Sequence, residues 1–306
     1  MSTLPDDTAA GDPDSPVDRD VVVVGGGAAG LSAAVFLARY GLETLVLARG
    51  TSAIHQCAHL ENYLGFPGGV SPERFVELGE TQAELEGATV EHDLVERVER
   101  HDDGFRVGTQ ADRDVVASYV LVATAYDGDP LEPLVDDVDR EDEHGFLDTD
   151  DGRTSVDGLY AAGWLTDDTV HQAVVNAGDG ARAAVALARD DLTDRYWPAV
   201  GELYVDWVVD DDRYGEDGWH DDVDDWFDRE IAPGAPADWD DADVERAREE
   251  MKTAFLDRGI TDVERERREE RGQRRVLESM DDDVVREYAA NLPECASTES
   301  AESADD

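Results

Sequence analysis

A glycine-rich turn near the start of the chain has the residue types and spacing needed to hold a phosphate. It reads Gly25-x-Gly27-x-x-Gly30, with Ala28 following the second glycine. The first glycine permits a tight turn, the second lets a pyrophosphate approach the backbone, and the third lets a helix pack closely on a strand. The turn therefore predicts a dinucleotide site, and a glycine turn that binds no ligand is the alternative.

Imidazole and thiol side chains form a second group that could do chemistry. His55, Cys57 and His59 alternate along one short segment, and His171 lies far along the chain. Cys57 could be a redox-active thiol, but the three residues lack a clear fourth metal ligand, so we predict no metal site. His171 could relay a proton. The alternatives are a loop packed over a cofactor for Cys57 and a polar helix-start residue for His171.

The elements that must position these residues follow an α/β pattern. A β-branched run, Val21 to Val24, precedes the turn, a helical apolar pattern follows it, and Thr44 to Leu47 complete a β-α-β unit. Ser71 and Pro72 begin a second predicted helix, and a long Ala-rich helix is expected from Val170 to about Asp190, with Thr169 and Gln172 as its capping box. Further strands are expected at 88–91, 94–100, 104–109, 114–124, 145–148 and 158–162.

The charge balance excludes several classes of protein. The 306 residues carry 76 Asp and Glu against 26 Lys and Arg, a net charge of −50, and Lys252 is the sole lysine. Such a surface repels nucleic acid and is typical of an extremely halophilic cytoplasm, where molar salt screens the charges. We expect a cytoplasmic protein with no membrane segment. The two cysteines, Cys57 and Cys295, form neither a disulfide framework nor a Cys-x-x-Cys pair.

Several motifs together resemble the FAD domain of the thioredoxin reductase-like pyridine nucleotide-disulfide oxidoreductase family, over roughly residues 20–190. They are the unit from Val21 to Leu47, Glu61-Asn62-Tyr63-Leu64-Gly65-Phe66-Pro67-Gly68-Gly69, Leu121-Val122-Ala123-Thr124, and Gly158-Leu159-Tyr160-Ala161-Ala162-Gly163 with His171-Gln172-Ala173. The resemblance implies an α/β fold: a Rossmann-like FAD-binding domain with three-layer ββα character. A mostly α-helical C-terminal region is expected to follow it.

The resemblance also implies roles for individual residues. Gly25, Gly27, Ala28 and Gly30 would bind the pyrophosphate of FAD, and the backbone at Val95 would lie by the adenine. Asn62 would approach the flavin ring, with Ala123 and Thr124 close to the cofactor. Gly163 would approach the second phosphate and the ribityl chain. Gln172 and Ala173 would direct amide groups and the helix dipole toward the pyrimidine edge of the flavin.

Three positions depart from the family pattern. Ala125 replaces the glycine of the family's common Ala-Thr-Gly. Trp164 replaces the carboxylate expected on the ribityl hydroxyls, and its side chain could either stack beside the cofactor or fill the core. Arg49 stands near the end of the second strand, where an acid usually holds the ribose. Arg49 could instead meet a 2′-phosphate, which leaves NADP as a weaker alternative cofactor, or it could be a solvated strand-end residue.

The family's NAD(P)H domain has no room in this chain. It is inserted before the Gly163 motif, yet 38 residues separate Thr124 from Gly163, where a second dinucleotide domain would need about 100. We therefore predict an FAD-dependent oxidoreductase without its own NAD(P)H domain or redox dithiol. The sequence does not identify the small-molecule substrate or the redox protein that would act as donor. The sequence is compatible with a homodimer. The alternative is a non-catalytic FAD- or nucleotide-binding module, or a pseudoenzyme.

The predicted organisation has four parts. Residues 1–18 are expected to form a disordered acidic leader, 19–190 the FAD-binding domain, 191–295 an acidic helical region and 296–306 a disordered tail. Five of the six Trp lie between Trp197 and Trp239, and they are expected to form the small core of a helical appendage. The arginines and acids of residues 242–275 predict helices laced with surface ion pairs.

Overall fold

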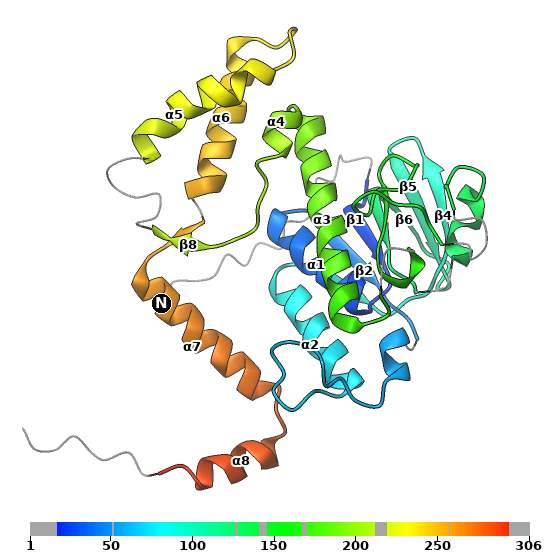
Figure 1. The fold of residues 1–306 in the computed structure, drawn as a ribbon. Helices are drawn as coiled ribbons and strands as arrows, with labels where there is room; N and C mark the ends of the chain where they lie inside the picture. The colour runs from blue at the N-terminus through cyan, green and yellow to red at the C-terminus, as the bar shows by residue number, and fades with distance from the viewer. Residues whose placement is uncertain are drawn as a thin grey trace, which may run out of the picture.

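The computed structural model describes residues 17–50, 52–125, 128–140, 146–166, 170–211, 219–256 and 258–293 (Figure 1). Thr169, Cys295, residues 1–16 and the predicted acidic tail lie outside the described residues. The strands are β1 (Arg19–Val24), β2 (Thr44–Leu47), β3 (Thr89–Glu91), β4 (Val95–His101), β5 (Gly104–Thr109), β6 (Asp114–Val122), β7 (Leu159–Ala161), β8 (Val209–Asp210) and β9 (Gly259–Ile260). The α-helices are α1 (Ala28–Tyr40), α2 (Pro72–Leu85), α3 (Ala173–Arg195), α4 (Pro198–Gly201), α5 (Trp219–Glu230), α6 (Asp241–Leu256), α7 (Asp262–Glu278) and α8 (Asp282–Ala290).

The main sheet combines a parallel layer with an antiparallel meander. Strands β3, β2, β1 and β6 lie side by side in this order, and each pairs with the next in parallel. Strand β7 also pairs with β6 in parallel. The strands β4, β5 and β6 form the antiparallel meander. Because β6 pairs with β5 through residues 114–117 and with β7 through residues 120–122, it belongs to both parts.

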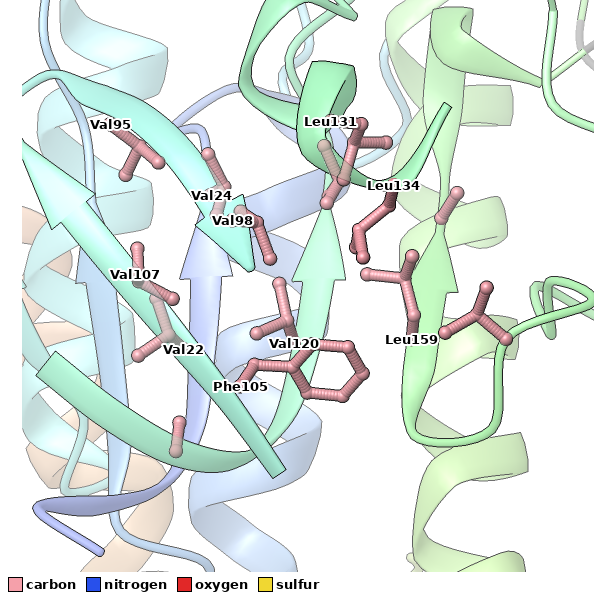
Figure 2. Close-up of a cluster of buried hydrophobic side chains, with 14 of the residues drawn as sticks. Val22, Val24, Val95, Val98, Phe105, Val107, Val120, Leu131, Leu134 and Leu159 are labelled. Carbon is pink, nitrogen blue, oxygen red and sulfur yellow. The ribbon is translucent and has the colours of Figure 1, made fainter. Parts of the chain in front are cut away.

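Two buried clusters define three layers. Val22 and Val24 on one face of β1 pack with Val98, Phe105 and other residues of the meander (Figure 2). Val21 and Val23, on the opposite face because side chains alternate along a strand, pack against α1 and α3. The order is meander, parallel sheet and helices, which confirms the predicted Rossmann-like fold with ββα character.

Most helices and strands begin and end where the capping residues and glycines of the sequence predict. Ser71 caps α2, its side chain accepting a hydrogen bond from the amide of Arg74 at 3.2 Å, and Gly41 ends α1 in the left-handed conformation. The strand predicted at 145–148 is wrong, since only Leu147 makes isolated bridges within the described part of this segment. The long helix α3 begins at Ala173 and continues to Arg195, past the predicted domain boundary at 190.

A small helical core packs on the end of α3. Trp197, buried at 2% exposure, contacts Phe227 and Trp239, and its indole Nε1 donates to the carbonyl of Ile231 at 3.1 Å. Arg195 at the end of α3 pairs with Glu250 on α6 at 2.8 Å. Burial and the neighbouring Glu250 carboxylate raise the pKa of Tyr196 to about 12. Trp197 thus forms the predicted appendage core, with Trp226 and Trp239 packed against it, and α3 ties this core to the sheet domain. The expectation that Trp207 joins the same core is wrong, since Trp207 is 55% exposed.

The last two helices lie apart from every core. Helices α7 and α8 have no buried residue and run along the periphery of the molecule (Figure 1, orange to red). The ion pairs predicted for this region are present, among them Arg268 with Glu264 and Arg274 with Glu270 at i,i+4 spacing. No helix within the described ranges is long and apolar enough to cross a bilayer.

Candidate functional site

The principal cavity lies where the glycine turn meets the start of α3. Its volume is about 590 Å³, within the usual range of ligand pockets. Its walls come from the turn after β1, the segment 52–62, the ends of β6 and β7, and the start of α3. The lining residues are Gly27, Ala28, Ala29, Ser52, Ala53, Ile54, Gln56, Cys57, His59, Leu60, Glu61, Asn62, Ala123, Ala125, Gly163, Trp164, His171, Gln172, Ala173 and Asn176.

The glycine turn is shaped by close backbone approaches. Gly25 has φ +113°, and a Cβ there would stand 2.4 Å from the carbonyl oxygen of Ala123. At Gly30 a Cβ would stand 1.9 Å from the carbonyl oxygen of Gly25. Only glycine fits at either position, so these two residues set the path of the turn from behind the cavity while Gly27 and Ala28 line it.

Two helix N-termini face this cavity. Helix α1 begins after Gly27 and α3 after Gln172; neither has a side-chain cap hydrogen bond, and neither carries an acid in its first turn. The first amides of a helix lack intrahelical acceptors and carry partial positive charge. In a chain of net charge −50, this pair of acid-free helix starts makes the cavity suited to an anionic ligand.

Amide side chains occupy the wall beneath the start of α3. Asn62 donates through Nδ2 to Oε1 of Gln172 at 2.6 Å, so the loop 61–69 is joined to α3. Asn176 is buried at 8% exposure, and its Oδ1 has no hydrogen-bond partner among the described residues. A buried acceptor without a donor is costly unless a ligand or water supplies one. Because this oxygen is itself closed off from solvent, Asn176 places that cost within the wall of the cavity.

Gly163 is held in the cavity wall by a carboxylate that the sequence analysis did not identify. Its backbone N–H donates to Oδ2 of Asp179 at 2.5 Å, and its φ is +76°. Asp179 is buried at 6% exposure and pairs with Arg182 one turn along α3. The sequence does contain a signal for Asp179: it is an acid on the buried face of a predicted helix, and a buried carboxylate usually needs a partner.

Trp164 and His171 form one wall together. Their rings stack with centroids 4.3 Å apart and an interplanar angle of 30°. Trp164 therefore lies in the cavity wall, stacked on the residue predicted to relay a proton. Cys57 and His59 also line the cavity, and Cys57 is exposed. Within the described ranges, no group of three or more His, Cys, Asp or Glu is arranged to hold a metal ion.

Several predicted site residues do not line this cavity. Arg49 donates to Oε1 of Gln110, Val95 is buried at 4% exposure in the core between the sheet layers, and Thr124 follows the lining residue Ala123. Ala125, at the position where the family commonly has glycine, has φ +62°. For a residue with a Cβ, the left-handed backbone conformation is unfavourable by about 1–2 kcal/mol, so the backbone at Ala125 is strained.

Replacing Gln172 tests the electrostatic character of the cavity. Gln172→Glu places a carboxylate at the N-cap of α3, facing the same space as any anionic ligand. We expect affinity for an anionic ligand to fall up to about five-fold, the scale of about 1 kcal/mol for a charge at a helix end. Titration of FAD by fluorescence quenching in multimolar KCl measures it. Gln172→Met removes the amide without adding charge, and an equal loss in that variant would contradict the electrostatic explanation.

Comparisons with known proteins agree with this geometry. Residues 19–93 match the family described as pyridine nucleotide-disulphide oxidoreductase. A thioredoxin reductase of Treponema pallidum is 35% identical over 111 residues, 35% of this chain and 36% of that protein. A ferredoxin–NADP reductase of Ignicoccus hospitalis is 28% identical over 182 residues, 57% of this chain and 58% of that protein. The matched part of the chain thus spans between about a third and somewhat over half of the length of these curated relatives.

A solved structure shares the fold. A thioredoxin reductase from Gloeobacter violaceus superimposes with a TM-score of 0.55 at 18% identity, covering 62% of this chain and 99% of that one. The likeness to the FAD domain of the thioredoxin reductase-like oxidoreductases, predicted from the motifs, is confirmed in sequence and fold.

Proposed function

From this likeness we propose that the chain is an FAD-dependent oxidoreductase that receives its electrons from a separate donor. The observation that carries the proposal is the cavity of about 590 Å³ onto which two acid-free helix N-termini and a glycine turn open. FAD carries a pyrophosphate whose negative charge suits these helix ends. The residues present therefore fit this group.

Each wall has a distinct part in holding the cofactor. Gly27 and Ala28 at the start of α1 would receive the pyrophosphate, and Gly163 would lie along the ribityl chain with its backbone fixed by Asp179. Asn62, Gln172 and Ala173 would adjoin the flavin ring. When bound, FAD supplies the capacity to take up and release two electrons.

The protein's own contribution to chemistry is positioning and charge. The N-terminus of α3 favours negative charge at the edge it faces, which supports the reduced state of a flavin placed there. His171, stacked on Trp164 in the same wall, is the candidate to hold or deliver a proton. Cys57, exposed and among the residues that line the cavity, is the second candidate for a reacting side chain.

The electron donor is proposed to be another protein or a diffusible reductant. The segment between Thr124 and Gly163 has 38 residues, part of which forms a short 3₁₀ helix, Asp129–Leu134, packed on the meander. This is too short for a second dinucleotide domain. NAD(P)H would have to reach the cavity without a domain dedicated to it.

An absorbance spectrum of protein purified in multimolar KCl tests the proposal, followed by release and identification of any chromophore. Flavin bands and released FAD, with reduction and reoxidation by some donor and acceptor pair, are the expected results. A folded, colourless protein that refuses added FAD would contradict the proposal and favour a nucleotide-binding module. A tightly held nicotinamide nucleotide without flavin would favour the NADP alternative raised by Arg49.

A further inference from the structure

We propose that a second cavity, along α3, binds a small zwitterion, a molecule of zero net charge that carries both a carboxylate and an ammonium group, as an α-amino acid does. This second cavity has a volume of about 440 Å³ and lies where α3 leads into α4 (Figure 1). It shares no lining residue with the candidate cofactor site. The proposal is therefore independent of the cofactor.

One face of α3 forms the floor of the second cavity. The residues of this face that line it, spaced three or four apart, are Gly178, Ala181, Val185 and Arg189. The first three are small, so they leave room above the helix. The far end is closed by Gly201 of α4, where a Cβ would stand 2.5 Å from the carbonyl oxygen of Arg189. The close approach of α4 to α3 thus requires a glycine there.

Two of the three arginines that line the second cavity already have carboxylate partners. Arg153 donates to both carboxylate oxygens of Asp190, at 2.6 and 2.8 Å. Arg182 pairs with Asp179 and with Asp151. The charges of these two arginines are therefore met within the protein, and a ligand gains little from them.

Arg189 differs from the other two arginines. Its Nη2 donates to the carbonyl oxygen of Tyr204 over a long 3.5 Å, and in the described ranges no carboxylate lies within ion-pair distance of it. Its Nε is closed off from solvent without a hydrogen-bond partner, so a ligand would meet the guanidinium group where it lines the cavity. A guanidinium group without a carboxylate partner suits a carboxylate ligand, which it can hold through two parallel N–H groups.

The surrounding charge favours a zwitterion over a simple anion. Glu202, next to Gly201, also lines the second cavity, and it pairs with no cation in the part of the chain that the structure describes. A chain of net charge −50 repels an anion, whereas a zwitterion carries no net charge. Its carboxylate would pair with Arg189 and its ammonium group with Glu202, so both unpaired charges of the cavity would gain a partner.

Calorimetric titration of the full chain with three matched probes tests the proposal. The probes are L-valine, isovalerate, which lacks the ammonium group, and isobutylamine, which lacks the carboxylate. All titrations use the same multimolar KCl, so chloride competes equally in each. We expect L-valine to saturate one site and to bind about five-fold more tightly than isovalerate and about ten-fold more tightly than isobutylamine. L-valine that fails to saturate a site would overturn the proposal, and so would isovalerate that binds as tightly as L-valine.

Two variants test the proposed ligand contacts. Arg189→Gln removes the guanidinium group and is expected to weaken L-valine binding about ten-fold or more. Glu202→Gln changes an exposed side chain, so the fold is preserved, as circular dichroism will verify. It is expected to weaken L-valine binding about two- to five-fold, the range of an exposed ion pair, without weakening isovalerate binding.

A matched control removes the same charge elsewhere. Arg271→Gln lies on α7, which contributes no residue to the second cavity, and this variant is expected to bind L-valine as the wild type does. If the Arg189 and Glu202 variants bound L-valine as tightly as the Arg271 variant, the ligand would lie elsewhere and the proposal would be wrong.

Discussion

Gly180→Ala is expected to lower the free energy of unfolding by about 3 kcal/mol and to abolish tight cofactor binding. Gly180 lies where α3 crosses α1, and a Cβ there would stand 2.0 Å from the carbonyl oxygen of Ala29. Backbone cannot yield as a flexible side chain can, so the two helices must separate. Ala29 lines the cavity in the first turn of α1, and the separation would displace the amides proposed to hold the pyrophosphate.

The control for this change lies two residues away on the same helix. A Cβ at Gly178 meets nothing within 4 Å. Gly178→Ala is therefore expected to stabilise the chain by about 0.5–1 kcal/mol, because glycine in a helix interior is less favourable than alanine. Chemical denaturation in constant KCl and FAD titration measure both variants. Equal effects of the two substitutions would contradict the explanation from the α1–α3 crossing.

Asp179→Ala is expected to cost about 2–3 kcal/mol of stability and to weaken cofactor binding more than ten-fold. The substitution removes the carboxylate oxygen that accepts from the buried Gly163 N–H, and losing a buried hydrogen bond is costly. It also removes a carboxylate that pairs with Arg182, which pairs with Asp151 as well. Gly163 would no longer be fixed at its φ of +76°, so the wall predicted to face the ribityl chain would lose its shape.

An isosteric variant separates the hydrogen bond from the charge. Asp179→Asn retains an oxygen that can accept from Gly163 while it removes the negative charge, so we expect it to keep most of the cofactor affinity. The same denaturation and titration measurements apply to both. If Asp179→Asn lost as much affinity as Asp179→Ala, the charge rather than the orientation of Gly163 would control the site.

Local sequence patterns predicted the elements and the turn that lie next to the cofactor site. The β-branched run from Val21 to Val24, the glycine spacing and the Ser71 cap all depend on neighbours a few residues away. For that reason β1, the turn and α2 were correctly predicted. The long helix was predicted as an element, but its start at Val170 was wrong. Gln172 is the N-cap, makes no side-chain cap hydrogen bond and is not the third residue of a capping box, and the helix runs from Ala173 to Arg195.

Features that depend on long-range contacts could not be predicted in the same way. Gly180 and Gly178 look alike in the sequence, and only the crossing of α1 over α3 distinguishes them. The carboxylate of Asp179 reaches Gly163 across the gap between two elements. The strand expected at 145–148 failed because Leu147, in the part of the chain that the structure describes, makes isolated bridges to Arg140 and Thr166 in place of a ladder.

The length of α3 links two regions that the sequence divides. Its first residue lines the cavity, and its last turn leads into Tyr196 and Trp197, which lie in the appendage core. At 23 residues it is a rod of roughly 35 Å, by the rise of about 1.5 Å per residue. Because one continuous helix belongs to both cores, we expect melting of either region to fray the other. A ligand that occupies the cavity is then expected to raise the melting temperature of the distant Trp-rich core as well, so that the two regions unfold as one cooperative unit.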